Sequence, residues 1–394
     1  MDLTSKKIAV VGAGIGGLTA ARAFALRGAQ VTVLEQAVAI REVGAGLQVS
    51  PNGVAVLRGL GLDGALQNTG AVAARAVCLC NADGAEVLRL DLDRFAPGQS
   101  HYCVHRADLI DVLARGARDA GAHIRLLQKV TEADPGMSPE VELAQGAFLK
   151  ADLVIGADGL HSAIRPALNP GETPFFTGQV AWRAVVDNDP ADMAEVRLFM
   201  GPGRHLVTYP LRGGTLRNIV AVEETGDWTE ESWSLVGDPD QLRHAFSGFG
   251  GEVGALLKRV DTVHRWGLFR HPVAKNWTGQ GVALLGDAAH PTLPFMAQGA
   301  CLALEDAWEL GAAIAGAENM TAGLAAYQSA RRPRASRIVA AASRNAWKYH
   351  LRQPALRGAA HLALRVGGRV APAAMVRQFD WIYGYDATGG QTLV

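Results

Sequence analysis

The sequence predicts an α/β fold in which a Rossmann-like domain with a parallel sheet is interleaved with an antiparallel-sheet domain and followed by C-terminal helices. Three observations predict this architecture. Near the N-terminus a glycine-rich turn joins a short apolar run to an alanine-rich stretch. Between residues 174 and 269, short apolar runs alternate with turn signals, which is typical of an antiparallel sheet. After residue 336, prolines divide an arginine-rich segment into expected helices.

The first element is a strand over residues 7–11, because the run is short, apolar and rich in β-branched side chains. Gly12, Gly14 and Gly17 follow with GxGxxG spacing. A helix, a second strand and an acidic residue come next: residues 18–26, residues 31–34 and Glu35. Such glycines permit a tight turn, close approach of a pyrophosphate and packing of helix on strand, and the helix N-terminus offers free N–H groups. Glu35 is placed to bind a ribose hydroxyl, so the unit predicts a dinucleotide site that fits FAD and NAD equally.

Two further turns after apolar strands narrow the dinucleotide to FAD. The first is Gly156-Ala157-Asp158-Gly159, which can bring Asp158 and the backbone amides at Gly159 close to a dinucleotide. The second is Gly286-Asp287, where Asp287 can hydrogen-bond the ribityl hydroxyls of a flavin. An Asp-Gly turn alone is usually only a turn, but the three motifs in this order predict FAD.

A loop stiffened by prolines leads from the third motif to a helix that opens at Gln298-Gly299. A helix N-terminus aimed at the pyrimidine end of a flavin would stabilise the anion of the reduced ring. We therefore expect Pro294, Gly299 and Ala300 to contact the cofactor.

Composition argues against several other functions. The formal net charge is zero, which argues against nucleic acid as a partner. The chain shows no signal-peptide pattern and no uncharged apolar run of the roughly 20 residues that a spanning helix needs. The four cysteines lack metal-site spacing and are expected to be free, mostly buried thiols, so no metal is predicted. A reducing, cytoplasmic location is expected.

The antiparallel region supplies candidates for substrate chemistry. Its expected strands are residues 180–186, 196–200, 206–209 and 217–222. His205 and Tyr209 lie four apart on one strand and therefore share a face. A histidine can take a phenolic proton, and a tyrosine can hydrogen-bond the substrate oxygen. Spacing alone also fits a rim histidine and a core tyrosine.

Three further side chains are candidates for a pocket between this sheet and the flavin. Arg183 and Arg217 are possible partners of a substrate carboxylate, because a guanidinium binds that group with two hydrogen bonds. Each also fits an ordinary surface arginine. Gln48 is a candidate for the pocket wall.

From Ile8 to about Arg334 the chain resembles the single-component (group A) FAD-dependent aromatic hydroxylases of the para-hydroxybenzoate hydroxylase superfamily. Arg106, in His105-Arg106-Ala107-Asp108-Leu109, matches the family arginine near the flavin phosphates. Gly44-Ala45-Gly46-Leu47-Gln48 matches the segment that lines the isoalloxazine, so the resemblance implies that Ala45 contacts the cofactor. The chain departs from the family at Ala297 and Cys301, where Gly and Asn are frequent.

Residues 178–183 and 205–210 look most like those of salicylate hydroxylases and 3-hydroxybenzoate 6-hydroxylases. In the latter group a histidine and a tyrosine at the positions of His205 and Tyr209 activate the phenol. The resemblance also implies that Gln298 faces the substrate, as a matching glutamine does in that group.

The resemblance implies a monooxygenase that binds FAD and uses O2 and either NADH or NADPH, the latter without a nucleotide domain of its own. Its substrate would be a small phenolic or aromatic acid of the salicylate, 3-hydroxybenzoate or 6-hydroxynicotinate type, hydroxylated through a flavin C4a-hydroperoxide. Three alternatives stay open. One is a related hydroxylase acting on a quinone precursor or a polyketide-like ligand. Another is a flavin oxidoreductase that inserts no oxygen. The third, from a different class, is a non-catalytic FAD-binding or redox-sensing protein.

The expected domains are interleaved along the chain. The FAD-binding domain comprises residues 1–72, 101–173 and 270–335; the substrate-binding domain comprises residues 73–100 and 174–269; residues 336–394 form a C-terminal helical segment. From Arg331 to Phe379 the chain carries many arginines but no Asp or Glu. This basic stretch fits a solvated helical cap whose charge is balanced elsewhere, and it also fits a homodimer surface or a patch for anionic lipid.

Overall fold

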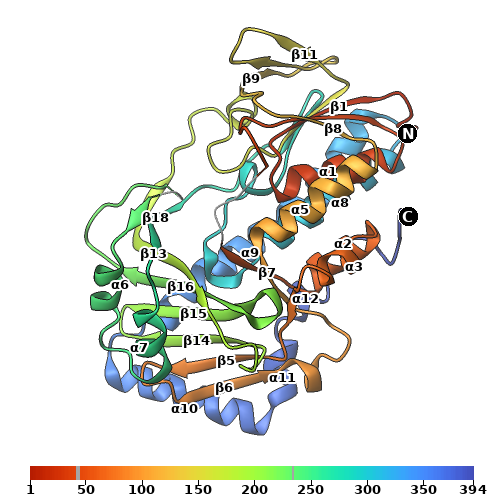
Figure 1. The fold of residues 1–394 in the computed structure, drawn as a ribbon. Coiled ribbons are helices and arrows are strands. Elements are labelled where there is room, and N and C mark those ends of the chain that lie inside the picture. The colour runs from red at the N-terminus through yellow and green to blue at the C-terminus, as the bar shows by residue number, and fades with distance from the viewer. Residues whose placement is uncertain (41–44, 233–234) are drawn as a thin grey trace.

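The computed structural model describes residues 1–40, 45–232 and 235–394. A mostly parallel sheet occupies one half of the molecule and a large antiparallel sheet the other, with helices between and beneath them (Figure 1). The chain ends in a series of helices that return to the antiparallel sheet. The α/β fold class predicted from the sequence is therefore confirmed.

The parallel sheet has the strand order β19-β20-β12-β1-β2-β8. Its strands are β1 (Lys7–Val11), β2 (Gln30–Leu34), β8 (His123–Arg125), β12 (Leu153–Gly156), β19 (Thr278–Gly279) and β20 (Val282–Leu284). Neighbours pair in parallel except β19, which is antiparallel to β20. On one face α1 (Ile15–Ala25) packs between α5 (Arg106–Asp119) and α8 (Gly299–Gly316) (Figure 1).

This strand order brings the three glycine-containing motifs together. β1, β12 and β20 are adjacent, and their last residues are in register: Val11 pairs with Gly156, and Gly156 pairs with Leu284. The turn after each strand therefore lies at the same carboxyl edge of the sheet. Open α/β sheets bind ligands at this edge.

The large sheet has the order β17-β18-β13-β16-β15-β14-β5-β6. Its strands are β5 (Ala76–Asn81), β6 (Glu86–Asp91), β13 (Phe175–Asp187), β14 (Glu195–Gly201), β15 (Arg204–Leu211), β16 (Leu216–Glu224), β17 (Val236–Gly237) and β18 (Val263–Arg270). Neighbours pair antiparallel except β14 and β5, which are parallel. Two distant segments, residues 76–91 and 175–270, thus build one sheet.

Side chains alternate between the two faces of this sheet. On one face Trp182, Phe199, Leu206 and Ile219 form a core with α6 (Pro239–Ala245) and α7 (Gly251–Lys258). The opposite face looks toward the carboxyl edge of the parallel sheet and carries the substrate-region side chains discussed below.

Two smaller sheets and several short helices accompany the two large sheets. One three-stranded sheet, in the order β3-β7-β4, joins β3 (Gly46–Val49), β7 (Tyr102–His105) and β4 (Val72–Ala73). A second, at the outer end of the molecule, contains β9 (Val130–Asp134), β10 (Glu140–Leu143) and β11 (Phe148–Lys150) (Figure 1). The short helices between them are α2 (Pro51–Gly59), α3 (Asp63–Gln67) and α4 (Leu92–Phe95).

The C-terminal helices are α9 (Met320–Tyr349), α10 (Pro354–Val370), α11 (Pro372–Arg377) and α12 (Asp380–Tyr383). Pro354 and Pro372 stand at the first turns of α10 and α11, where a missing N–H costs nothing. Both helices pack against β6 at one edge of the large sheet (Figure 1). Across the described residues, no helix combines the length and apolar character that crossing a bilayer requires.

Candidate active site

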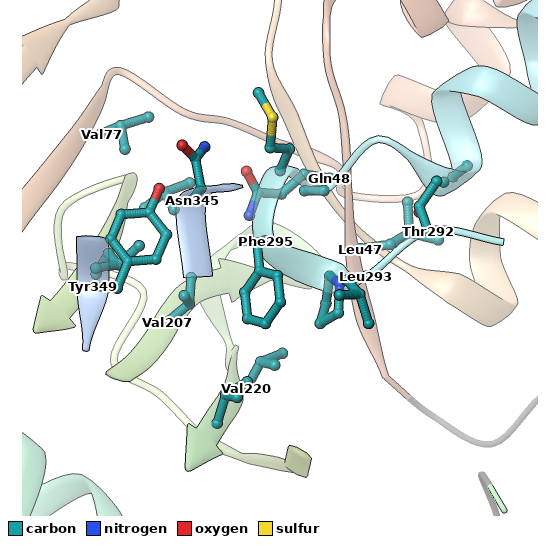
Figure 2. A pocket seen from close by; sticks show the side chains of 18 of the residues that line it. Leu47, Gln48, Val77, Val207, Val220, Thr292, Leu293, Phe295, Asn345 and Tyr349 are labelled. Carbon is teal, nitrogen blue, oxygen red and sulfur yellow. The ribbon is translucent and has the colours of Figure 1, made fainter. Parts of the chain in front are cut away.

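A cavity of about 820 Å³ lies between the carboxyl edge of the parallel sheet and the inner face of the large sheet. All three motifs contribute to its wall, through Gly14, Gly159 and Asp287. The volume lies within the usual range of ligand pockets, about 300–1,000 Å³. Figure 2 shows part of the wall, where Phe295 from the loop after Asp287 faces Val207 from β15.

The glycine turn has the shape that a bound pyrophosphate requires. Gly12 has φ +98°, and a Cβ added there would lie 2.5 Å from the carbonyl oxygen of Ala157. A Cβ at Gly17 would lie 2.0 Å from the carbonyl oxygen of Gly12. A Cβ at Gly14 would meet no atom within 4 Å, because this residue borders the cavity. Since the first turn of α1 also carries no acidic residue, its N–H groups are available to an anion, and the turn fits the phosphates of FAD.

Glu35 follows β2 and lies beside this turn. Its carboxylate accepts hydrogen bonds from the amides of Ala13 (2.8 Å) and Ala37 (2.8 Å). The side chain is therefore held next to the glycine turn, but it is not among the residues that line the cavity.

Arg106 and Asp287 line the cavity from opposite elements. Arg106 opens α5, and Asp287 lies in the turn after β20. Burial raises the pKa of Asp287, while electrostatic interactions with His290 and Arg106 act in the opposite direction. Burial also lowers the pKa of Arg106. A polar ligand that hydrogen-bonds both groups would relieve this desolvation.

Only part of the segment expected to line the isoalloxazine lies at the cavity wall. Residues 46–48 line the cavity, including Gln48. Ala45 is buried just behind this wall, where its carbonyl oxygen accepts a hydrogen bond from the amide of Arg106 (2.8 Å). Gly44 lies outside the described residues.

Asp158 differs from its expected role as a cofactor ligand. Its carboxylate turns back into its own loop and accepts hydrogen bonds from the Ser162 hydroxyl (2.6 Å) and the Ala163 amide (2.7 Å). A short side-chain oxygen commonly satisfies nearby amides in this way. The adjacent Gly159 borders the cavity, so Asp158 shapes the turn and Gly159 meets the ligand space.

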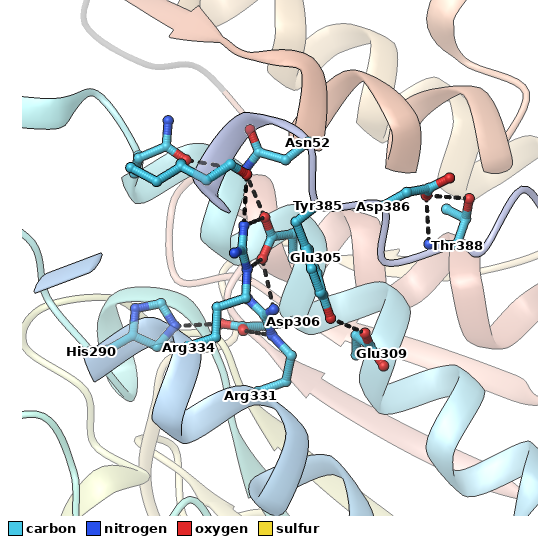
Figure 3. A network of polar contacts seen from close by, with 12 residues as sticks. Asn52, His290, Glu305, Asp306, Glu309, Arg331, Arg334, Tyr385, Asp386 and Thr388 are labelled. Atoms are coloured by element: carbon cyan, nitrogen blue, oxygen red, sulfur yellow. Dashed lines mark hydrogen bonds and ion pairs between the residues drawn. The ribbon is translucent and has the colours of Figure 1, made fainter. Parts of the chain in front are cut away.

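Gln298 also departs from its expected position facing the substrate. Ala297, with φ +51° and ψ +35°, turns the chain immediately before it. The Gln298 side chain consequently points away from the cavity, donating to the Ser50 hydroxyl (2.9 Å) and accepting from the Asn52 amide (3.0 Å). Asn52 continues to the buried carboxylate of Glu305 at 2.6 Å (Figure 3). Pro294, Gly299 and Ala300, the other residues predicted from this loop, do line the cavity.

His205 and Tyr209 both line the cavity from β15, and both are almost fully buried. Burial, reinforced by the neighbouring His350, holds the pKa of His205 well below its usual value, so the ring is neutral at pH 7. Burial likewise raises the pKa of Tyr209 above its ordinary range, so its hydroxyl stays protonated. The wall thus presents a neutral imidazole and a phenolic hydrogen-bond donor.

Of the two predicted arginines, only Arg183 reaches the cavity. Its guanidinium lies 4.8 Å from the ring centroid of Trp266, and burial lowers its pKa to about 10. Arg217 lies on the opposite face of the sheet, where it donates to Asn188 (2.9 Å) and pairs with Asp192 (3.5 Å). The register explains this difference, because Tyr209 pairs with Asn218, which places Asn218 on the cavity face and Arg217 on the other.

Two residues beside His205 were not predicted from the sequence. The Nδ1 atom of His205 lies 2.7 Å from Nε2 of His350, and Nδ1 of His350 lies 3.0 Å from Oε1 of Glu224. His350 lies in the basic C-terminal stretch and Glu224 at the end of β16. Neither position belongs to a local motif, so no pattern in the sequence indicates them.

Comparison with known proteins identifies the family. Residues 5–342 match the family model described as FAD binding domain. The chain is 33% identical to a 3-amino-4-hydroxybenzoate 2-monooxygenase from Streptomyces platensis, over 97% of this chain and 96% of the relative. It is also 33% identical to a 3-hydroxybenzoate 6-hydroxylase from Klebsiella oxytoca, over 95% and 96% of the two chains.

Among solved structures, a variant of Klebsiella pneumoniae HpxO in complex with FAD matches with a TM-score of 0.80 and 26% identity, over 95% of this chain and 98% of that one. The FAD cofactor predicted from the three motifs is thus confirmed by the family. The chain belongs to the FAD binding domain family, and with it to the FAD-dependent aromatic hydroxylases that its sequence resembles.

Proposed function

We propose that this enzyme hydroxylates a small phenolic acid of the 3-amino-4-hydroxybenzoate or 3-hydroxybenzoate type, with NADH or NADPH as reductant. The observation that carries the proposal is the single cavity that joins the FAD motifs to the face bearing His205, Tyr209 and Arg183. The names of the two relatives support this substrate class.

Each of these three side chains suits one part of such a substrate. The Arg183 guanidinium offers a carboxylate two charge-assisted hydrogen bonds. The Tyr209 hydroxyl, kept protonated by burial, donates to the phenolic oxygen. The neutral His205 ring accepts the phenolic proton, which makes the aromatic ring electron-rich.

The cofactor would be held by groups that already face the cavity. The amides around Gly14 would bind the phosphates, Arg106 would support them, and Asp287 would accept hydrogen bonds from the ribityl chain, since all three residues line the cavity. Bound FAD, once reduced by NAD(P)H, supplies the activated oxygen that hydroxylation needs. The protein's part is to orient the substrate beside it and to exclude water.

The direct test is a substrate screen with the FAD-loaded enzyme. NADH and NADPH oxidation, O2 uptake and H2O2 release are measured with 3-amino-4-hydroxybenzoate, 3-hydroxybenzoate, salicylate and 6-hydroxynicotinate, and products are identified. We expect one compound to stimulate oxidation with little H2O2 and to gain one oxygen atom. Reductant consumption that no aromatic acid accelerates would contradict the proposal.

A matched pair of variants tests the carboxylate site. Arg183 and Arg265 each stack on a tryptophan, at 4.8 Å from Trp266 and 5.0 Å from Trp182, but on opposite faces of the sheet. We expect Arg183→Met to raise the KM of the acid about 10- to 100-fold, because a hydrogen bond to a charged group contributes a binding free energy of that size. Arg265→Met should leave that KM unchanged. Equal effects of the two substitutions would remove Arg183 from the substrate site.

A second candidate substrate is a larger apolar molecule, such as a quinone precursor or a polyketide-like ligand. The cavity continues along the inner face of the large sheet to the C-terminal helices, where its wall is apolar: Leu79, Leu198, Met200, Leu364, Met375 and Phe379. A small acid would leave this extension unfilled. If alkyl-substituted phenols are turned over with a lower KM than the parent acids, the larger substrate is favoured.

A further inference from the structure

The contacts of His205 continue beyond the cavity to the protein surface. Its Nδ1 atom is 2.7 Å from Nε2 of His350, whose own Nδ1 is 3.0 Å from Oε1 of Glu224. The second carboxylate oxygen of Glu224 accepts hydrogen bonds from Arg352 at 3.0 and 2.7 Å. We name His205, His350 and Glu224 the exit chain.

Exposure rises at the outer end of the exit chain. His205 is 2% exposed and faces the cavity, and the His350 side chain is 1% exposed. The Glu224 side chain is 32% exposed and that of Arg352 is 68% exposed. The chain therefore leads from the buried wall of the cavity to solvent in two hydrogen bonds.

Backbone contacts hold the members in line. The amide of Gly203, in the turn between β14 and β15, donates to the carbonyl oxygen of His350 (3.0 Å). The carbonyl oxygen of Gly203 accepts from the amide of Glu224 (2.9 Å). One residue thus fixes both outer members against the strand that carries His205. A Cβ at Gly203, which has φ +71°, would lie 2.8 Å from the Arg352 guanidinium.

The two rings have compatible hydrogen-bonding capacities. A neutral imidazole has one donor and one acceptor nitrogen. With the proton of each ring on Nδ1, His205 donates to Nε2 of His350, and His350 donates to the Glu224 carboxylate. The Nε2 atom of His205 is then the acceptor left for the cavity.

Burial, together with the nearby charges, favours the neutral forms of the His205 and His350 rings. Burial, with His350 as the second cause, lowers the pKa of His205; on its other sides it meets the rings of Tyr349 and Phe295. Burial lowers the pKa of His350, Glu224 opposes this shift, and Arg352 and Arg204 reinforce it. Burial raises the pKa of Glu224, but its hydrogen bonds to Arg352 and His350 outweigh that effect and lower it. Two neutral rings ending at an ionised carboxylate are poised to pass a proton outward.

We propose that the exit chain conducts the phenolic proton of the substrate to solvent. The substrate O–H bond breaks as its proton moves to Nε2 of His205. The Nδ1 proton of His205 moves to Nε2 of His350, and the Nδ1 proton of His350 moves to Glu224, which releases it to water. One proton enters and one leaves, and the phenolate stays in the cavity. This inference rests on the proposed function, in which His205 takes the phenolic proton.

The first test needs no substrate, so it stands even if the proposed function fails. The ring nitrogens of 15N-histidine-labelled, FAD-loaded enzyme are titrated by NMR, in wild type, Glu224→Gln and His271→Gln. His271 is the control because it is also a largely buried ring paired with a carboxylate, Glu231 at 3.0 Å. We expect Glu224→Gln to move the titration of His350 to lower pH and to perturb His205, and His271→Gln to move neither. If His205 titrates at the same pH in Glu224→Gln as in wild type, the proposal of the exit chain is wrong.

The second test measures turnover of 3-amino-4-hydroxybenzoate by the same variants and by His350→Gln. Because general acid–base groups contribute about 10²–10⁴-fold, we expect His350→Gln to lower kcat by at least about tenfold with little change in KM. Added imidazole, a small mobile base, should restore part of the lost kcat. A loss of kcat that imidazole does not restore, with an unchanged pH profile, would make His350 structural. If wild type turns over none of the acids in the substrate screen, the proposed function is at fault and the NMR result alone decides on the exit chain.

Discussion

Two histidine–carboxylate groups lie near the cavity, and they differ in how their charges are held. The first is the exit chain. The second, the closed cluster, joins α8 and α9 to the segment after β20 (Figure 3) and comprises His290, Glu305, Asp306, Arg331 and Arg334. The exit chain has one ionised group near the surface and two neutral rings. In the closed cluster, two buried carboxylates are matched by two arginines.

The closed cluster has no gradient of exposure. The side chains of Glu305, Asp306 and Arg331 are all 0% exposed. Arg331 contacts Glu305 at 2.7 Å and Asp306 at 2.8 Å. Burial alone would raise the pKa of Asp306, but His290 and Arg331 outweigh it and lower the pKa to about 2. Histidine and carboxylate side chains therefore hold fixed charges in the closed cluster, whereas in the exit chain we propose that they pass a proton.

The closed cluster accounts for the start of the basic C-terminal stretch. Arg331 is buried and the Arg334 side chain is 11% exposed, and both pair with Glu305 of α8, so neither belongs to a solvated cap. The amide of Gly286, in the third motif, donates to Asp306 (3.1 Å). The fixed charges thus anchor the turn that presents Asp287 to the cavity.

The largest expected effect comes from breaking the closed cluster. Arg331→Met leaves Glu305 and Asp306 without their shared buried partner, which we expect to lower the free energy of unfolding by about 3–5 kcal/mol. Urea denaturation of the FAD-loaded enzyme measures it. The adjacent exposed residue is the control, and Arg332→Met should change stability by less than about 0.5 kcal/mol.

The exit chain should respond much less to the same kind of change. Glu224→Gln removes a charge that is 32% exposed, and pairs of that kind contribute about 0–1 kcal/mol. A loss as large as that of Arg331→Met would show that the exit chain is a structural element, and the contrast between the two groups would fail.

The next effect concerns Asp287, which lies between the closed cluster and the cavity. Asp287→Ala removes the carboxylate that we propose accepts hydrogen bonds from the ribityl chain, and we expect FAD to bind about 10- to 100-fold more weakly. Quenching of flavin fluorescence measures the dissociation constant. Asp287→Asn keeps a hydrogen-bonding group of the same size and should recover part of the affinity. Unchanged FAD retention in the alanine variant would count against Asp287 as a ligand.

As the pH falls, the exit chain should lose its contribution to stability before the closed cluster does. The folded-state pKa values of His205 and His350 are lowered, so their contribution to stability is complete above the unfolded value of about 6.5 and is lost as pH falls below it. Asp306, lowered from 3.8 to about 2, keeps its contribution until pH falls below about 4. We expect stability to decline first through the histidines, by up to about 1.4 kcal/mol per pH unit for each ring.

The double variant His205→Gln, His350→Gln isolates that decline. Its free energy of unfolding should fall less steeply than that of wild type between pH 6.5 and 4.5, while His101, whose pKa burial lowers to about 4, contributes equally to both proteins. Identical slopes would mean that these two histidines are protonated in the folded enzyme.

The sequence could predict the features that depend on local motifs, but not those that depend on tertiary contacts. The fold class and FAD follow from motifs whose effect is local, since Gly12 and Gly17 need a particular backbone wherever the turn occurs. Arg217 could not be placed, because the face of β16 that meets the cavity depends on its register with β15. His350 lies 145 residues from His205 and reaches it only through tertiary contacts. The sequence therefore predicts the cofactor site better than the substrate site.

The smallest effect tests the loop that separates the closed cluster from the cavity. Ala297 adopts φ +51°, a left-handed conformation that costs an L-residue about 1–2 kcal/mol and that glycine adopts readily. Ala297→Gly relieves that strain but adds freedom to the unfolded chain, so we expect a net gain of only about 0.5–1 kcal/mol. Denaturation of the enzyme with and without FAD measures it. Because Ala297 directs the chain into Gly299 and Ala300 at the cavity wall, FAD affinity should be kept in Ala297→Gly and reduced in Ala297→Val, whose branched side chain resists the turn.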